Sequence, residues 1–148
     1  MDQRLLDQIT DVLNDGALNY NVFLRLFEMP LDDLLEKQLI IKALLGPKAT
    51  LDDIKKIDKA LAWPILKDHL FFRGDEASGP DALVLKSQHL VALVDELESQ
   101  VRDLIDATQT IDLFQLQDGH PAYPVFWDFA FLFLSASNAS ILIGSSSD

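Results

Sequence analysis

The chain has 148 residues, the usual size of one domain, and 49% of them are apolar, which excludes a disordered protein. It contains no cysteine, which excludes disulfide bonds, thiolate catalysis and zinc–cysteine sites. The formal net charge of −12 argues against binding to nucleic acids or anionic membranes, because like charges repel. The acidic start of the chain lacks the pattern of a signal peptide, so we expect a cytoplasmic protein that forms one domain over residues 1–148.

The acidic charge is concentrated in the second half of the chain. Residues 1–70 contain nine basic and twelve acidic side chains, whereas residues 71–148 contain three basic and twelve acidic ones. Long-range attraction would steer a basic protein partner towards such a half. The alternative interpretation is that the acidity only keeps a bacterial-type protein soluble.

Helices are predicted throughout the first seventy residues. The evidence is an apolar stripe in the first segment, acidic residues at the start of the third, and a Thr–Asp pair that resembles a capping box. The expected helices cover residues 2–15, ending at Gly16; residues 21–29, closed by Pro30; residues 31–46; and a segment that starts with Thr50 and Asp53 and is interrupted at Trp63 and Pro64.

The longest helical pattern follows, over residues 82–107. Its leucines recur every seven residues, at Leu83, Leu90, Leu97 and Leu104. Fewer than four clean heptads are present, which favours a helix lying on a core or a sheet over a coiled-coil dimer. Ser87 is the expected N-cap, and residues 82–86 fit either a short strand or the start of the helix.

The last forty residues are rich in aromatic and β-branched side chains, which are typical of strands. Three strands are predicted, over residues 110–118, 125–137 and 139–144, with a tight turn at Ser137–Asn138. The expected fold is therefore α+β, with a helical N-terminal half, one long helix and a C-terminal antiparallel three-stranded meander or hairpin.

The middle of these strands lies in the most apolar stretch of the chain, residues 120–134. A membrane helix needs about 20 successive apolar residues, and this stretch is shorter and contains Asp128, so it predicts a strand. Alternation places Phe129, Phe131 and Phe133 on one face, which we expect to pack beneath the helices. Asp128 falls on the opposite, mixed face, where Arg73 is a candidate partner.

No catalytic motif, metal-ligand spacing or cofactor-binding motif stands out, so no catalytic residue, metal or cofactor is predicted. Acidic side chains crowd the long helix and share faces at a spacing of three residues. They predict a partner-binding face, with a merely solvated helix face as the alternative. The residues of this face are Asp95, Glu98, Asp103 and Asp106.

A second candidate site lies where the segments 73–80 and 118–128 would meet. Together they would supply an aromatic wall and a few polar groups, as small-ligand pockets require. The candidate pocket residues are Arg73, His120, Tyr123, Trp127 and Asp128.

These features favour a non-enzymatic binding module whose acidic second half engages a basic protein partner. In size, class and charge the chain resembles the small immunity and antidote proteins of bacterial toxin systems, with no shared motif. That resemblance implies an inhibitor of the immunity type. The alternatives are a small-ligand-binding protein or enzyme that uses the candidate pocket, and a structural homo-oligomer, such as a homodimer formed through the long helix or a strand edge.

Overall fold

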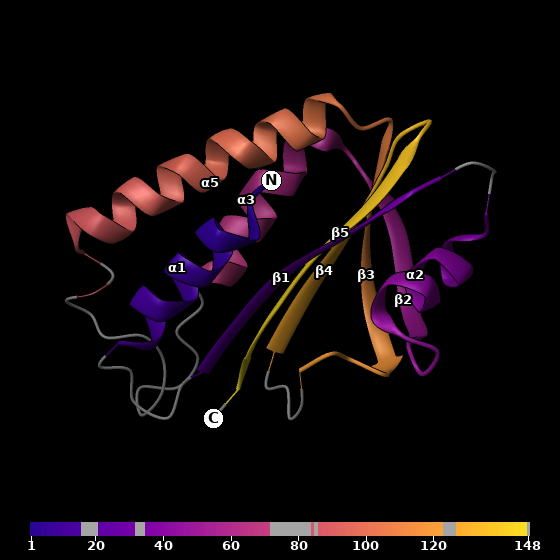
Figure 1. The fold of residues 1–148 in the computed structure, drawn as a ribbon, viewed down its shortest axis with the longest axis horizontal. Helices are drawn as coiled ribbons and strands as arrows, with labels where there is room; N and C mark the ends of the chain where they lie inside the picture. The colour runs from indigo at the N-terminus through magenta and orange to yellow at the C-terminus, as the bar shows by residue number, and fades with distance from the viewer. Residues whose placement is uncertain (16–20, 32–34, 72–83, 85, 123–126, 148) are drawn as a thin grey trace.

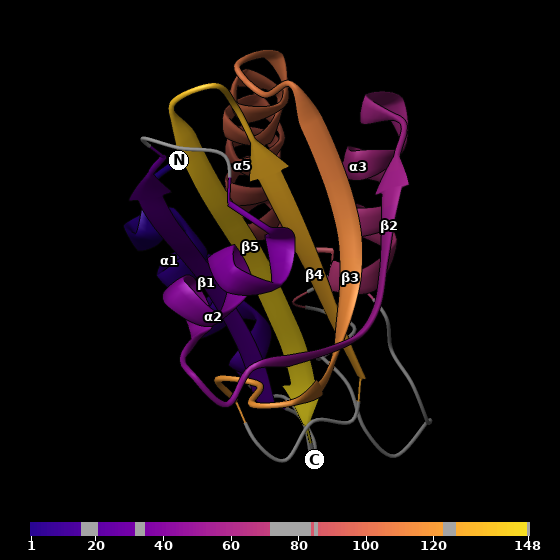
Figure 2. The same cartoon turned by 90° about the vertical axis from the view of Figure 1, so that its right-hand side faces the viewer.

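The computed structural model describes residues 1–15, 21–31, 35–71, 84, 86–122 and 127–147. Its helices lie on both sides of one antiparallel sheet with the strand order β1-β5-β4-β3-β2 (Figures 1 and 2). In chain order the elements are α1 (Gln3–Asn14), β1 (Asn21–Pro30), α2 (Lys37–Leu45), β2 (Thr50–Ile57), α3 (Lys59–Leu70), α5 (Gln88–Asp106), β3 (Thr110–Asp118), β4 (Trp127–Leu134) and β5 (Asn138–Ser147).

The predicted α+β class is confirmed, but the three-stranded sheet is wrong, because the sheet has five strands. The first addition is β1, which replaces the helix expected over residues 21–29. Leu24 of β1 is buried against the helices on one face, while Phe23 and Phe27 pack on the other. Because β1 carries apolar residues on both faces, its sequence does not alternate cleanly, and periodicity does not distinguish so short a segment from a helix.

The second addition is β2, where Thr50 and Asp53 were expected to open a helix. Its apolar residues are spaced by three, which imitates a helical face. A β-bulge between Leu51 and Asp53 explains that spacing, since it brings Leu51 and Ile54 to the same side of the sheet. The helix begins later, at Lys59, and Asp58 is its N-cap, whose side chain accepts a hydrogen bond from the backbone N–H of Ala60.

The other helix predictions hold with altered ends. α1 buries the expected stripe, and its C-cap is Asp15. The expected C-cap, Gly16, lies outside the described residues. Pro64 lies inside α3 and does not interrupt it. α5 begins where predicted, with the Ser87 hydroxyl accepting from the N–H of Leu90 at 3.2 Å, whereas most of residues 82–86 lie outside the described part. No helix among the described residues is long and apolar enough to cross a membrane.

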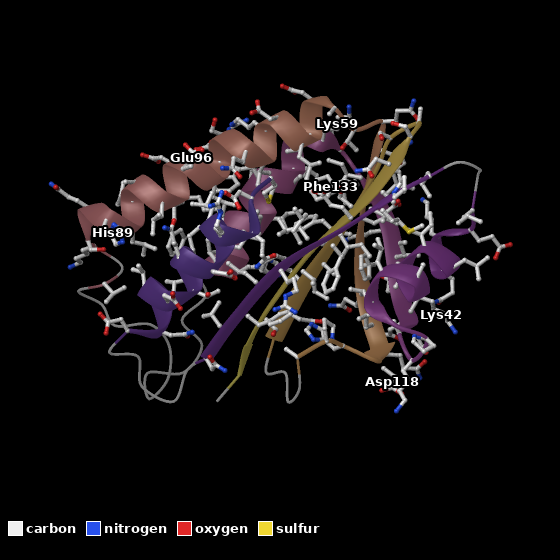
Figure 3. All side chains as sticks on the ribbon, viewed as in Figure 1. Lys42, Lys59, His89, Glu96, Asp118 and Phe133 are labelled. Carbon is white, nitrogen blue, oxygen red and sulfur yellow. The ribbon has the colours of Figure 1, made fainter. Side chains whose placement is uncertain are left out.

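Two apolar cores flank the sheet. α1, α3 and α5 cover one face, where the stripe of α5 packs over Phe129, Phe131 and Phe133 as expected from the alternation in β4 (Figure 1). α2 covers the other face, where Ile40 and Ile41 pack over Ala130 and Leu132 of the same strand. Figure 3 shows Phe133 between the sheet and the upper helices. β4 is thus the central strand, buried on both sides.

A turn joins β4 to β5, but it covers residues 135–137 rather than Ser137–Asn138, because Asn138 already belongs to β5. The backbone N–H of Ser135 donates to the carbonyl of Asn138, and the N–H of Asn138 donates to the Ser135 hydroxyl. The outer edge of β1 is also hydrogen-bonded, by side chains of α1. Gln3 accepts from the N–H of Leu26 and donates to the carbonyl of Leu24, and Asn14 accepts from the N–H of Val22.

Candidate functional site

The sheet separates between β3 and β4, and this separation creates a cavity. β3 pairs with β4 only from Thr110 to Leu113, although β3 continues to Asp118 along β2 and β4 extends back to Trp127 along β5. A cavity of ≈ 200 Å³ occupies the gap and has walls from both faces of the sheet. It is lined by Asp53, Lys55, His69, Leu113, Phe114, Gln115, Asp128 and Phe129.

Asp128 and His120 face each other beside this cavity. The Nε2 atom of His120 lies 3.7 Å from Oδ2 of Asp128, which is too long for a hydrogen bond. The imidazole is 9% exposed, and its Nδ1 lies 2.8 Å from the carbonyl oxygen and 3.0 Å from the nitrogen of Ala122. Nε2 is therefore a buried polar atom without a hydrogen-bond partner among the described residues.

The cross-strand neighbours of Asp128 on β5 and β1 lie next to His120. Asp128 lies opposite Ser145 on β5, and Ser145 lies opposite Phe23 on β1. The imidazole of His120 contacts the edge of the Phe23 ring, with the ring centroids 6.3 Å apart. The guanidinium of Arg25 lies 5.5 Å from the centroid of the same Phe23 ring. The histidine is thus held between an aromatic ring and a carboxylate.

Burial sets the ionisation of both groups. Desolvation lowers the pKa of His120, and the nearby Asp128 carboxylate opposes that change only in part. Desolvation likewise raises the pKa of Asp128 against the attraction of His120 and, more weakly, His69. Both side chains are therefore shifted towards their neutral forms, as expected for a polar pair placed in a partly apolar site.

The pair lacks the arrangement of a nucleophilic catalyst. A serine nucleophile needs a base within hydrogen-bonding distance. Ser145 is the nearest cross-strand hydroxyl, but the nitrogens of His120 face Ala122 and Asp128, and no hydrogen bond joins it to Ser145 within the described residues. Likewise, the described ranges contain no group of three His, Asp or Glu side chains placed to hold a metal ion.

The structure joins two of the five predicted pocket residues, His120 and Asp128. Arg73, Tyr123 and the side chain of Trp127 lie outside the described part of the chain. Sequence reasoning missed His69, Lys55, Asp53 and Gln115, which reach the cavity from α3, β2 and β3. No local pattern marks these residues, because only the packing of distant elements brings them together.

The predicted acidic face lies on the outer side of α5. Asp95, Asp103 and Asp106 are exposed, and none of them forms an ion pair among the described residues. Glu98 differs, because its Oε1 lies 2.6 Å from Nη2 of Arg102 and its charge is neutralised locally. Glu96 is exposed as well, and Figure 3 shows it on the side of α5 that faces away from the sheet.

The part of the helical layer formed by α1 and α5 is acidic, and the opposite side of the molecule has a small excess of basic residues. α1 lies beside α5, joined by a hydrogen bond of 2.9 Å from the Asp2 N–H to the Gln100 side chain (Figure 1). Residues 1–15 and 88–106 carry nine acidic and two basic side chains, whereas residues 35–57, which span α2 and β2, carry three acidic and five basic ones. Figure 3 shows Glu96 on α5 and Lys42 on α2 at opposite sides.

A groove of ≈ 350 Å³ lies between α3 and α5, at the end of the acidic layer. Trp63, Pro64 and Ile105 form its apolar part. Its two basic residues are engaged within the chain, because Lys59 donates to the carbonyl of Thr108 and Arg102 pairs with Glu98. Asp106 forms no ion pair among the described residues, and neither does Lys59, whose ammonium is bound to a backbone carbonyl.

Comparison with known proteins returned no match: no family model fits the chain, and no curated protein or solved structure is significantly similar to it.

Proposed function

We propose that the protein is a non-enzymatic binding module that engages a basic protein partner through the acidic layer formed by α1 and α5. The observation that carries this proposal is the exposure of Asp95, Asp103 and Asp106 on the outer side of α5, with no internal cation to neutralise them among the described residues. We place this binding in the cytoplasm, because a chain without cysteine fits a reducing compartment.

The charge distribution supports such a role in two ways. The acidic layer and the basic side form a dipole, which would orient an approaching basic partner before contact. The groove between α3 and α5 would then accept an apolar side chain of the partner against Trp63 and Ile105, beside Asp106. A charged rim around an apolar anchor is the usual arrangement of a specific interface. Inhibition of a basic toxin or enzyme is one function that this surface would serve.

Affinity capture tests the proposal. The wild-type protein, carrying a C-terminal tag, is used to capture partners from cell extract at low and at high salt. We expect partners with a basic isoelectric point, captured strongly at about 50 mM salt and at least about tenfold less at about 500 mM, because screening weakens exposed charge pairs. The double variant Asp95→Lys/Asp103→Lys should lose the same partners.

A control variant separates the acidic layer from net charge. Glu36→Lys/Asp118→Lys changes the net charge equally, and both acids are exposed, one before α2 and one at the end of β3, away from the acidic layer (Figure 3). It should retain the partners. Acidic partners, capture that is insensitive to salt, or equal loss in both variants would contradict the proposal.

A second function is favoured by the orphaned Nε2 of His120 and the cavity beside Asp128. A small molecule with a cationic or hydrogen-bond-donating group would satisfy Asp128 and fill the gap between β3 and β4, against Phe114 and Phe129. The test is the melting temperature in the presence of a panel of small primary amines and the matched alcohols. A rise that is lost in Asp128→Asn would support the site, and no rise with any compound would contradict it.

A further inference from the structure

We propose that the outer edge of β2 pairs with β2 of a second copy of this chain. The two strands run antiparallel about a two-fold axis at Ile54, so that the two sheets become one continuous sheet. This interaction is independent of the acidic layer and leaves α1 and α5 of both copies exposed, on the same side of the continuous sheet.

The two edges of the sheet differ in how many of their backbone groups are hydrogen-bonded by side chains. Side chains of α1 hydrogen-bond the edge of β1 at Val22, Leu24 and Leu26. On the β2 edge, Gln38 does so only at the start, where it donates to the carbonyl of Ala49 and accepts from the N–H of Leu51. Within the described chain, no side chain hydrogen-bonds the backbone of residues 52–57. An uncovered strand edge is a template for a further strand.

The charges along the β2 edge are complementary to those of a second copy that runs in the opposite direction. The sequence from Leu51 to Ile57 reads LDDIKKI, with two acids before Ile54 and two lysines after it. All four charged side chains are exposed, and none forms an ion pair among the residues that the structure describes. The charges are therefore available to a partner that approaches along the edge.

Antiparallel pairing about Ile54 converts this pattern into complementarity. Asp53 of each copy faces Lys55 of the other, and Asp52 faces Lys56, so every acid of the edge meets a lysine. Leu51 and Ile57 face each other further out, and Ile54 faces its own copy. Directly opposed side chains of opposite charge stabilise an antiparallel pair, and like charges destabilise it. Any shift of the register by two residues would break this match.

The central pair, Asp53 with Lys55, carries most of the specificity. Asp53 and Lys55 lie opposite Gln115 and Leu113 of β3, in regular register and on the same face of the sheet. Asp52 lies at the bulge, where the strand is irregular, so its pairing with Lys56 contributes less. The decisive substitutions are therefore those at positions 53 and 55.

Sedimentation-velocity ultracentrifugation of the full chain over a range of concentrations tests the pairing. The wild-type protein should show a concentration-dependent dimer. In the homodimer of Asp53→Lys, and likewise in that of Lys55→Asp, two pairs of like charges face each other. Each single variant should therefore weaken the dimer at least about tenfold. An equimolar mixture of these two variants should recover it, because in the heterodimer both lysines of the first variant face both aspartates of the second. The double variant Asp53→Lys/Lys55→Asp should recover the homodimer.

Control variants change the same charges elsewhere. Asp11→Lys on α1 and Lys48→Asp before β2 are exposed positions with equal changes of net charge, and both should dimerise as the wild type does. A wild-type protein that remains monomeric at all concentrations would overturn the proposal. A dimer that is unaffected by reversal at 53 or 55, or a mixture that fails to recover it, would overturn it equally.

The register has its own test, because the chain contains no cysteine. In Ile54→Cys the two-fold axis places the two Cα atoms about 4.5–5.5 Å apart, within the range for a disulfide. Mild oxidation should crosslink this variant to a covalent dimer, whereas Asp11→Cys should remain largely monomeric. Equal crosslinking of both variants would overturn the pairing about Ile54.

Discussion

The ammonium of Lys37 and the carboxylate of Asp112 join α2 to β3 through a partly buried ion pair. The Nζ atom lies 2.9 Å from each carboxylate oxygen and donates a hydrogen bond to Oδ1. The Asp112 side chain is 1% exposed, whereas Lys37 is 43% exposed, so only the acid is removed from water. The remaining oxygen, Oδ2, accepts no hydrogen bond among the described residues. Lys37 therefore offsets the free-energy cost of burying the Asp112 carboxylate.

Removal of one partner should cost far more than removal of both. Lys37→Met leaves an unpaired buried carboxylate and should lower the free energy of unfolding by about 3–5 kcal/mol. Lys37→Met/Asp112→Leu removes the charge as well and should be within about 1 kcal/mol of the wild type. Urea denaturation at neutral pH measures both. If the single and double variants were equally unstable, the ion pair would not be the cause.

The His120–Asp128 pair should make stability depend on pH. The folded pKa of His120 lies below its usual 6.5, so its contribution to stability is fully present above that pH and is lost as the pH falls. The folded pKa of Asp128 is raised, so its ionised form opposes folding at neutral pH. Asp128→Asn should therefore increase the free energy of unfolding at neutral pH, by about 1 kcal/mol.

Urea denaturation between about pH 7 and about pH 5 distinguishes the contribution of His120 to stability from that of Asp128. His120→Gln should flatten the loss of stability towards the acidic end, because the buried imidazole no longer has to accept a proton. Asp128→Asn should steepen that loss, since His120 then lacks its only nearby counter-charge among the described residues. Identical profiles in the wild type and both variants would contradict the burial of the pair.

Gly144 is required by the packing of its cross-strand neighbours. It lies opposite Leu24 on β1 and Phe129 on β4. A Cβ atom at this position would lie 2.5 Å from Cζ of Phe129 and 2.7 Å from Cδ2 of Leu24. Gly144→Ala should therefore lower the free energy of unfolding by about 1–3 kcal/mol. The double variant Gly144→Ala/Phe129→Leu should recover part of the lost free energy of unfolding. Strict additivity of the two effects on that free energy would argue against a clash.

The sequence predicts elements that have one buried face and clear ends. α5 has a one-sided apolar stripe and Ser87 as its cap, and β4 alternates phenylalanines with smaller residues. β1 and β2 were missed for opposite reasons. β1 is covered on both faces and shows no period, whereas the bulge in β2 places Leu51 and Ile54 on one face at a helix-like spacing. Such effects depend on the neighbouring strands, which a local pattern does not contain.

The same distinction applies to the candidate site. His120 and Asp128 were predicted to share a pocket because both lie in the segment 118–128, and the structure places them beside each other. The walls contributed by His69 and Lys55 were not predicted, because α3 and β2 are distant from β4 in the sequence and are brought to it only by the tertiary fold. The acidic residues of α5 could be placed on an outer face from helical periodicity alone.

Site-specific photocrosslinking is the most direct test that the acidic layer is the binding face. Because the chain has no cysteine, Ser99→Cys on the outer side of α5 and Ala43→Cys on α2 each carry one benzophenone label at an exposed position. We predict that irradiation in cell extract crosslinks the label at position 99 to the basic partner, and that Asp95→Lys/Asp103→Lys abolishes the crosslink. Crosslinking of that partner from position 43 but not from position 99 would contradict the assignment of α1 and α5 as its binding surface.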